Sequence, residues 1–229
     1  EMCIRDSYDP AQRSRSGLSG GDAAKVEQAH QEGKSLGGDY LAAVTAEALK
    51  TAECNACMKR IVAAPTAGSC GVLPAVLLPL ARAGEADEEA VCEALYVAAG
   101  FGQVIAARAT LAGAEGGCQA EVGIASAMAA SAAVELMGGD PQQCLDAAST
   151  VLMNMLGLVC DPVGGLVEYP CQNRNAAGVA NALIAAEMAL AGLSQLIPFD
   201  EMLETMYTVG KRLPAELRET AMGGCAIAP

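Results

Sequence analysis

The chain has 229 residues, enough for one large domain or two small ones, and its 27 Asp and Glu residues against 14 Lys and Arg residues give a net charge of −13. Apolar residues make up 52% of the chain, aromatic residues only 3%, and Trp is absent. Ala and Gly dominate, which suits closely packed helices and suits strands poorly. An acidic chain with few aromatic residues is also a poor partner for nucleic acid or an anionic membrane.

Ten cysteines are present. A disulfide framework belongs to short, loop-rich secreted chains, whereas this chain is long and helix-rich and shows no signal peptide. The pattern therefore favours a reducing cytoplasm and metal-bound thiolates. No apolar run reaches the ~18 residues that a membrane span needs. The closest run, residues 122–134, is short and built from small residues, as in a buried core helix.

The predicted elements follow in chain order. Residues 1–15 are expected to be a disordered or artefactual segment, and residues 16–229 a single helical domain. Asp87 can cap one helix. Asp140 can cap another, which starts at Pro141 after Gly138 and Gly139 end the preceding helix. The expected helices span residues 23–32, 40–58, 73–81, 87–111, 119–137, 141–155 and 175–193, with further starts at Pro198 and Pro214. With almost no strand-like alternation, the sequence predicts an all-α, compact multi-helix domain.

Three cysteines stand in glycine- or proline-containing contexts that break helices, namely Cys118, Cys160 and Cys171. A thiolate that binds a metal is more often held on a turn, and three thiolates can hold three corners of a four-iron cluster. Their wide spacing does not match zinc fingers or ferredoxins. The competing interpretation is that free cysteines are buried small hydrophobes, which we apply to Cys92 and Cys144.

The remaining polar motifs carry weaker signals. Cys54 and Cys57 form a C-x-x-C pair late in a predicted helix, without the preceding strand of a thioredoxin motif. His30 is the only histidine, which excludes a His-based triad within this chain. The loop 65–71 resembles an anion cradle, with two hydroxyls and N–H groups at a helix start. Arg174 has the fork geometry that binds a carboxylate.

Four strings in this sequence are long and specific. They are Gly17-Leu-Ser-Gly-Gly-Asp22, Arg60-Ile-Val-Ala-Ala-Pro-Thr-Ala-Gly-Ser-Cys-Gly-Val-Leu-Pro74, Glu115-Gly-Gly-Cys-Gln-Ala-Glu121 and Leu158-Val-Cys-Asp-Pro-Val-Gly-Gly-Leu-Val-Glu-Tyr-Pro-Cys-Gln-Asn-Arg-Asn175. They resemble the α subunit, or equivalent domain, of the iron–sulfur-dependent L-serine dehydratases (L-serine ammonia-lyases). The resemblance covers nearly everything from about residue 16 onward.

The resemblance implies an all-helical catalytic domain that holds a 4Fe-4S cluster through Cys118, Cys160 and Cys171. It implies the conversion of L-serine to pyruvate and ammonia, with a β subunit that completes the active site in a homo- or hetero-oligomer. The substrate carboxylate then meets the open iron, the loop that carries Thr66 and Ser69, or Arg174, with Asn175 in the same candidate binding set. The catalytic base is not assigned and can belong to the partner.

Two alternatives stay open. One is a related lyase that acts on L-cysteine or another β-substituted amino acid, because an open iron binds a thiol more tightly than a hydroxyl. The other is a non-catalytic electron-transfer or scaffold subunit, whose cluster would need Cys70 or Cys225 as its fourth ligand. We do not transfer to Cys225 the resting-ligand role that a C-terminal cysteine has in some family members.

Overall fold

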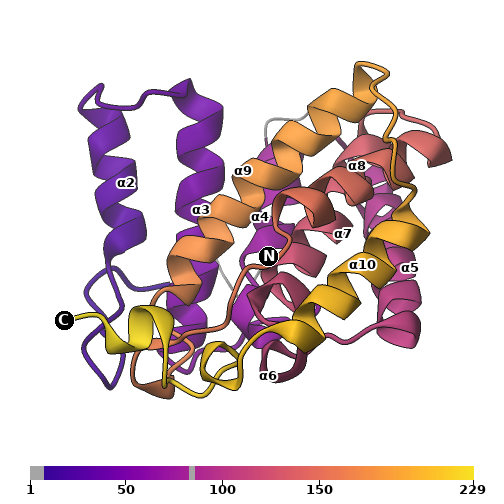
Figure 1. Ribbon diagram of the computed structural model, residues 1–229. Helices are drawn as coiled ribbons and strands as arrows, with labels where there is room; N and C mark the ends of the chain where they lie inside the picture. Colours follow the sequence, from indigo (N-terminus) through magenta and orange to yellow (C-terminus); the bar gives the residue numbers. More distant parts are fainter. Residues whose placement is uncertain (1–7, 83–85) are drawn as a thin grey trace.

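The computed structural model describes residues 8–82 and 86–229, and within these ranges the chain is helical (Figure 1). The only β-type pairing in the described chain is an isolated parallel bridge between Cys160 and Arg218. The α-helices are α2 (Asp22–Gln31), α3 (Gly38–Ala56), α4 (Val72–Arg82), α5 (Glu88–Arg108), α6 (Gly113–Gly116), α7 (Val122–Leu136), α8 (Pro141–Asn154), α9 (Cys171–Leu190) and α10 (Phe199–Arg212). The predicted all-α class is confirmed.

Short 3₁₀ turns fill several of the connections between these helices. They are η1 (Ala67–Ser69), η2 (Cys118–Ala120), η3 (Val163–Gly165), η4 (Ala215–Leu217) and η5 (Gly224–Ile227). The expected last helix after Pro214 is therefore only the single turn η4. The short helix α6 was not anticipated, because its Gly-Ala-Glu-Gly sequence has low helix propensity.

Two helix starts form as the sequence predicts. The Asp87 carboxylate accepts a hydrogen bond of 2.9 Å from the Ala90 N–H at the start of α5. At α8, Asp140 and Gln143 form a reciprocal capping box, and Pro141 occupies the first turn. These caps satisfy backbone N–H groups that a helix start leaves without partners.

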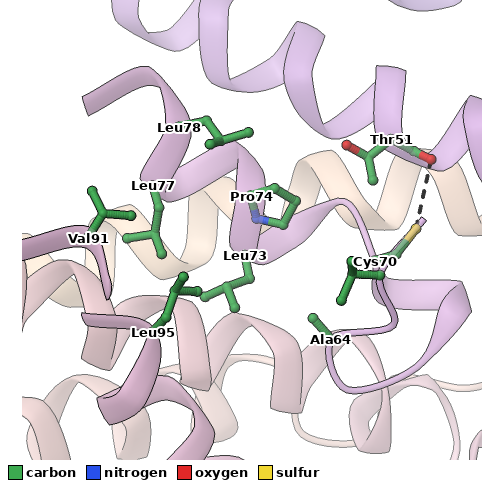
Figure 2. A pocket seen from close by; sticks show the side chains of 10 residues that line it. Thr51, Ala64, Cys70, Leu73, Pro74, Leu77, Leu78, Val91 and Leu95 are labelled. Carbon is green, nitrogen blue, oxygen red and sulfur yellow. Dashed lines mark hydrogen bonds between the residues drawn. The ribbon is translucent and has the colours of Figure 1, made fainter. Parts of the chain in front are cut away.

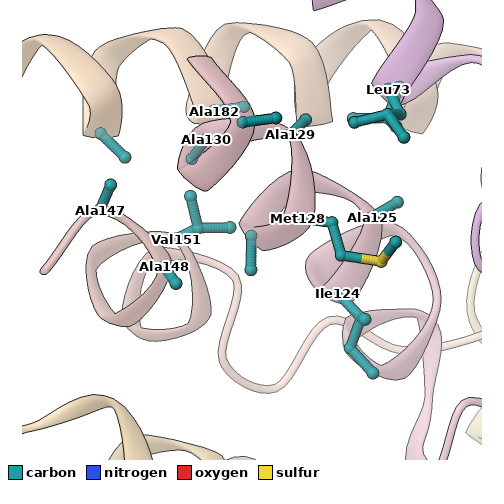
Figure 3. Packing of buried hydrophobic residues seen from close by; sticks show 14 of the residues in the cluster. Leu73, Ile124, Ala125, Met128, Ala129, Ala130, Ala147, Ala148, Val151 and Ala182 are labelled. Atoms are coloured by element: carbon teal, nitrogen blue, oxygen red, sulfur yellow. The ribbon is translucent and has the colours of Figure 1, made fainter. Parts of the chain in front are cut away.

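The core is centred on α7, which packs against α4, α5, α8 and α9. Every residue from Val122 to Val134 is buried, and most of them are Ala, Ser or Gly. Figure 3 shows Ala129 of α7 next to Ala182 of α9 and Ala130 of α7 next to Val151 of α8, while Ala125 lies on the side of Leu73 of α4. Small side chains let these helix axes approach closely, so van der Waals contact replaces the large aromatic residues that the chain lacks.

Helix α2 lies at the edge of the molecule against α3 (Figure 1). A carboxylate that is almost fully buried, that of Glu53 on α3, accepts hydrogen bonds from the N–H groups of Gly21, Asp22 and Ala23. A negative charge at a helix N-terminus is favourable, and here it also joins two helices.

The N-terminal segment is described from residue 8, and residues 1–7 lie outside the described residues. The hydroxyls of Ser14 and Ser16 donate to the Glu168 carboxylate at 2.6 and 2.8 Å. The chain just upstream of residue 16 thus contacts the loop that leads into α9. The domain boundary at residue 15 stays a prediction.

Helix α5 corrects one expectation. It is long and apolar enough, by length and composition alone, to cross a membrane, and only 17% of its most apolar window is buried. The sequence shows no uninterrupted apolar run here, because Glu93 and Gln103 interrupt it without lowering the mean hydropathy much. Its buried side packs on α7, as a helix of a helical bundle does.

Candidate functional site

Cys118, Cys160 and Cys171 come from three separate segments at one end of the helices. Cys118 begins η2 between α6 and α7, Cys160 follows α8, and Cys171 is the first residue of α9. We expected Cys171 in an irregular stretch before a helix that starts at residue 175. Instead the helix begins at Cys171 itself, directly after Pro170, whose peptide bond with Tyr169 is cis.

The Cys118 and Cys160 thiols share a hydrogen bond in which Cys160 donates. That bond lowers the pKa of Cys118 against the opposing effect of burial, and the positive charge of Arg174 lowers it further. The same contact raises the pKa of Cys160. Burial raises the pKa of the Cys171 thiol to about 12, with the nearby Cys118 charge adding to the shift. Of the three thiols, Cys118 is thus the one whose pKa the site lowers, whereas the site raises the pKa of Cys160 and Cys171.

The backbone around Cys160 is held by the C-terminal segment. The Cys160 N–H donates to the Leu217 carbonyl at 2.9 Å, and the Glu219 N–H donates to the Cys160 carbonyl at 2.7 Å. Next along the chain, the Asp161 carboxylate accepts from the Cys225 N–H at 2.6 Å. In Figure 1 the C-terminal segment accordingly lies against the loop that precedes α9.

Two buried side-chain amides fix the loops around the thiols. Gln119, beside Cys118, donates to the carbonyls of Gly116 and Met206 and accepts from the Gly157 N–H. Asn175 accepts from the Gly71 N–H at 2.9 Å and donates to the carbonyls of Gly68 and Cys171 at 2.8 and 2.9 Å. The amide of Asn175 is thus used within the protein, where it joins the loop 65–71 to the start of α9.

Arg174 points into the protein rather than into solvent. Its guanidinium forms an ion pair of 2.7 Å with Asp161 and donates to the Val159 carbonyl at 3.0 Å. It also faces the Cys118 sulfur. The carboxylate that this arginine binds is therefore one of the protein's own, that of Asp161.

The loop 65–71 does not present its later N–H groups as a free anion cradle. The Ser69 N–H donates to the Thr66 carbonyl, the Cys70 N–H to the Ala67 carbonyl, and the Gly71 N–H to Asn175. The Thr66 and Ser69 hydroxyls lie 3.1 Å apart. Ser69 is fully buried and Thr66 only partly, so Thr66 carries the more accessible hydroxyl.

Sequence reasoning missed Glu121, which belongs to the same set of loops. A methyl group placed on Gly113 would lie 2.8 Å from the Glu121 carboxylate and 2.9 Å from the Cys160 sulfur, so both groups meet over this glycine. Burial and the nearby Glu219 carboxylate raise the pKa of Glu121 from 4.5 to about 7, although a hydrogen bond from Thr66 opposes the shift. The only signal in the sequence was its position just after Cys118.

The other cysteines lie elsewhere. Cys70 is buried and its thiol donates to the Thr51 carbonyl at 3.8 Å, at one end of a half-open apolar pocket of about 240 Å³ (Figure 2). Cys144 is buried as expected, whereas Cys92 is exposed on α5, contrary to the core interpretation. The direction of the Cys70 thiol, toward α3, argues against it as a fourth cluster ligand.

The described residues contain no group of three His, Cys, Asp or Glu side chains placed to hold a single metal ion. A cluster makes a different demand, because each cysteine binds a different iron atom. Two thiols in hydrogen-bonding contact, a third near them, and a glycine that leaves room beside the Cys160 sulfur fit that demand. All cysteines of the described chain are free thiols.

Comparison with known proteins gives a consistent result. The family model described as "Serine dehydratase alpha chain" matches residues 1–226. A "Probable L-serine dehydratase, alpha chain" of Bacillus subtilis is 50% identical over 216 residues, which cover 94% of this chain and 72% of that protein. An "L-serine dehydratase, alpha chain" of Peptoniphilus asaccharolyticus is 52% identical over 90% of this chain and 70% of its own length. "L-serine dehydratase 2" of Escherichia coli is 43% identical over 79% of this chain and 40% of its own length.

Proposed function

Because the chain belongs to the serine dehydratase alpha-chain family, we propose that it catalyses β-elimination of L-serine to pyruvate and ammonia, with a 4Fe-4S cluster held by Cys118, Cys160 and Cys171. The observation that supports the proposal is that Cys118 acts on the pKa of both Cys160 and Cys171, which come from two other segments, in a chain about 50% identical to proteins named for this activity.

The bound cluster would supply an iron with an open position, a Lewis acid toward the substrate hydroxyl. The chain's own residues prepare that position. Arg174 stabilises the Cys118 thiolate, which is the form of cysteine that binds metal. Asp161 holds Arg174 in place through their ion pair. Gly113 leaves space beside the Cys160 sulfur that any side chain would fill.

The four residues proposed for substrate binding, Thr66, Ser69, Asn175 and Arg174, have different roles. The Thr66 hydroxyl is the accessible donor for the substrate carboxylate, and the buried Ser69 hydroxyl orients it. Asn175 contributes indirectly. Its amide bonds to Gly68, Gly71 and Cys171, and so holds the loop that carries Thr66 against the start of α9. Arg174 stabilises negative charge on the Cys118 sulfur, which its guanidinium faces.

The word "alpha" in the relatives' names supports a multi-subunit enzyme, and we propose that a separate β subunit completes the active site. The Escherichia coli relative, of which this chain covers 40%, supports the same division, since its remaining length leaves room for a second domain. Free thiols throughout the described chain support a reducing, cytoplasmic location.

The test is anaerobic reconstitution with iron and sulfide, in the presence of the β subunit, followed by measurement of pyruvate formed from L-serine. Cys160→Ser should lose cluster absorbance and at least about a hundredfold in kcat, since it removes a ligand. Cys92→Ser, at an exposed cysteine near the start of α5, is the matched control and should retain both. A Cys160→Ser variant with full absorbance and full activity would end the proposal.

A further inference from the structure

The position of Glu121 is unusual for an acidic residue at a helix start. It stands immediately before α7, where a carboxylate commonly caps the helix, yet its side chain makes no capping hydrogen bond. The carboxylate turns instead toward Gly68 and Gly113, where added methyl groups would lie 3.7 and 2.8 Å from its Oε2 atom. Gly113 thus makes room for this carboxylate beside the Cys160 sulfur, and Gly68 lies within van der Waals contact of it.

No described residue supplies a positive charge to this carboxylate. The arginine of the site, Arg174, is paired with Asp161, and none of the ion pairs among the described residues involves Glu121. The groups that face Glu121 are the Thr66 hydroxyl and a second carboxylate, that of Glu219. Two neighbouring carboxylates without a cation favour binding of a cation from outside the chain.

We propose that Glu121, assisted by Glu219, binds the α-ammonium group of the amino-acid substrate and so selects amino acids over hydroxy acids. The inference rests on the proposed function. The substrate is a zwitterion, so a site that binds its carboxylate through Thr66 also needs an acceptor for its ammonium group. The Glu121 carboxylate lies beside the Thr66 hydroxyl, so the two residues are close enough to reach the two ends of so small a molecule. When the ammonium group becomes the donor to Glu121, the single Thr66 proton is released to donate to the substrate carboxylate.

The test compares L-serine with 3-hydroxypropanoate, which is the same molecule without the amino group. Both would be measured on reconstituted enzyme, with its β subunit, as wild type and Glu121→Gln. The variant should raise the KM for L-serine about ten- to a hundredfold, the usual effect of losing a hydrogen bond between charged groups. It should change the inhibition constant of 3-hydroxypropanoate by less than about twofold, because that molecule has no ammonium group.

Glu115→Gln is the matched control, since it removes the same charge from an exposed residue of α6 and should change neither constant. Glu219→Gln should shift the KM for L-serine in the same direction as Glu121→Gln, by a smaller factor. Iron content of each variant shows that the cluster is equally loaded.

Three results would overturn the proposal: equal weakening of both ligands, no effect on either, or a loss in kcat with both constants unchanged. Calorimetric titration of the same proteins with L-serine separates this proposal from the proposed function. If the wild type binds L-serine but forms no pyruvate, the function fails, and the effect of Glu121→Gln on binding still decides the role of Glu121.

Discussion

The helical core around α7 and the loop-rich end that carries Cys118, Cys160 and Cys171 are held together by different interactions. In the core, small apolar side chains of α7, α8 and α9 fill the space between closely approaching helices. At the loop-rich end, single polar side chains such as Gln119 and Asn175 each join several backbone segments. The core should therefore be sensitive to side-chain volume, and the loop-rich end to hydrogen-bonding capacity.

The largest expected effect lies in the core. Ile124 is fully buried on α7, and Ile124→Ala should lower the free energy of unfolding by about 4 kcal/mol, because it removes buried methyl groups and leaves a cavity. Urea denaturation of the iron-free protein measures it. Leu36→Ala, at a fully exposed leucine, should change stability by less than about 0.5 kcal/mol. Equal effects at both positions would contradict the volume account.

At the loop-rich end, Asn175→Leu keeps the side-chain volume but removes every hydrogen bond. We expect a loss of about 3 kcal/mol in unfolding free energy, because the Gly71 N–H and the carbonyls of Gly68 and Cys171 lose their partner. Retention of iron after reconstitution should also fall, since Cys171 is no longer held. Asn154→Leu is the control, at an exposed amide that donates to Asn181. It should change the unfolding free energy and the iron content little. A stable, iron-loaded Asn175→Leu variant would show that side-chain volume, and not hydrogen bonding, determines stability at the loop-rich end as well.

A gain in volume should affect the core too. A methyl group on Gly178 of α9 would lie 2.6 Å from the Ser126 hydroxyl and 2.8 Å from Val122 of α7. Gly178→Ala should therefore cost about 2 kcal/mol through overpacking. Gly100→Ala on α5 meets no atom within 4 Å and should stabilise the helix by about 0.5 to 1 kcal/mol. Differential scanning calorimetry of the pair tests whether the two glycines respond in opposite directions.

The smallest expected effect concerns the pH dependence of the loop-rich end. The pKa of Glu121 is raised from 4.5 to about 7, so between these values the folded chain keeps a proton that the unfolded chain releases. Stability should fall as pH rises through this window. Relative to Glu121→Gln, the wild-type iron-free protein should lose about 1 to 2 kcal/mol between pH 4.5 and 7. Parallel stability curves for the two proteins would contradict the buried position of this carboxylate.

Local sequence signals predicted the core better than the site. Asp87 and Asp140 start their helices as expected, because capping depends on neighbouring residues only. The contacts of the loop-rich end join residues far apart in sequence, such as Cys160 with Leu217 and Asn175 with Gly68, which no local pattern specifies. The resemblance singled out Cys118, Cys160 and Cys171, whose role as ligands stays a prediction. Glu121 has no local signature, because its environment is created by Gly68, Gly113 and Glu219.

The central claim is that three thiols hold an iron–sulfur cluster, and iron and sulfide analysis of anaerobically reconstituted protein tests it most directly. We predict about four iron and four sulfide atoms per chain, as a 4Fe-4S cluster contains. Serine in place of Cys118, Cys160 or Cys171 should lower both values, whereas Cys144→Ser, at a buried core cysteine, should leave them unchanged. Iron bound equally by all four variants, or none bound by the wild type, would contradict the account.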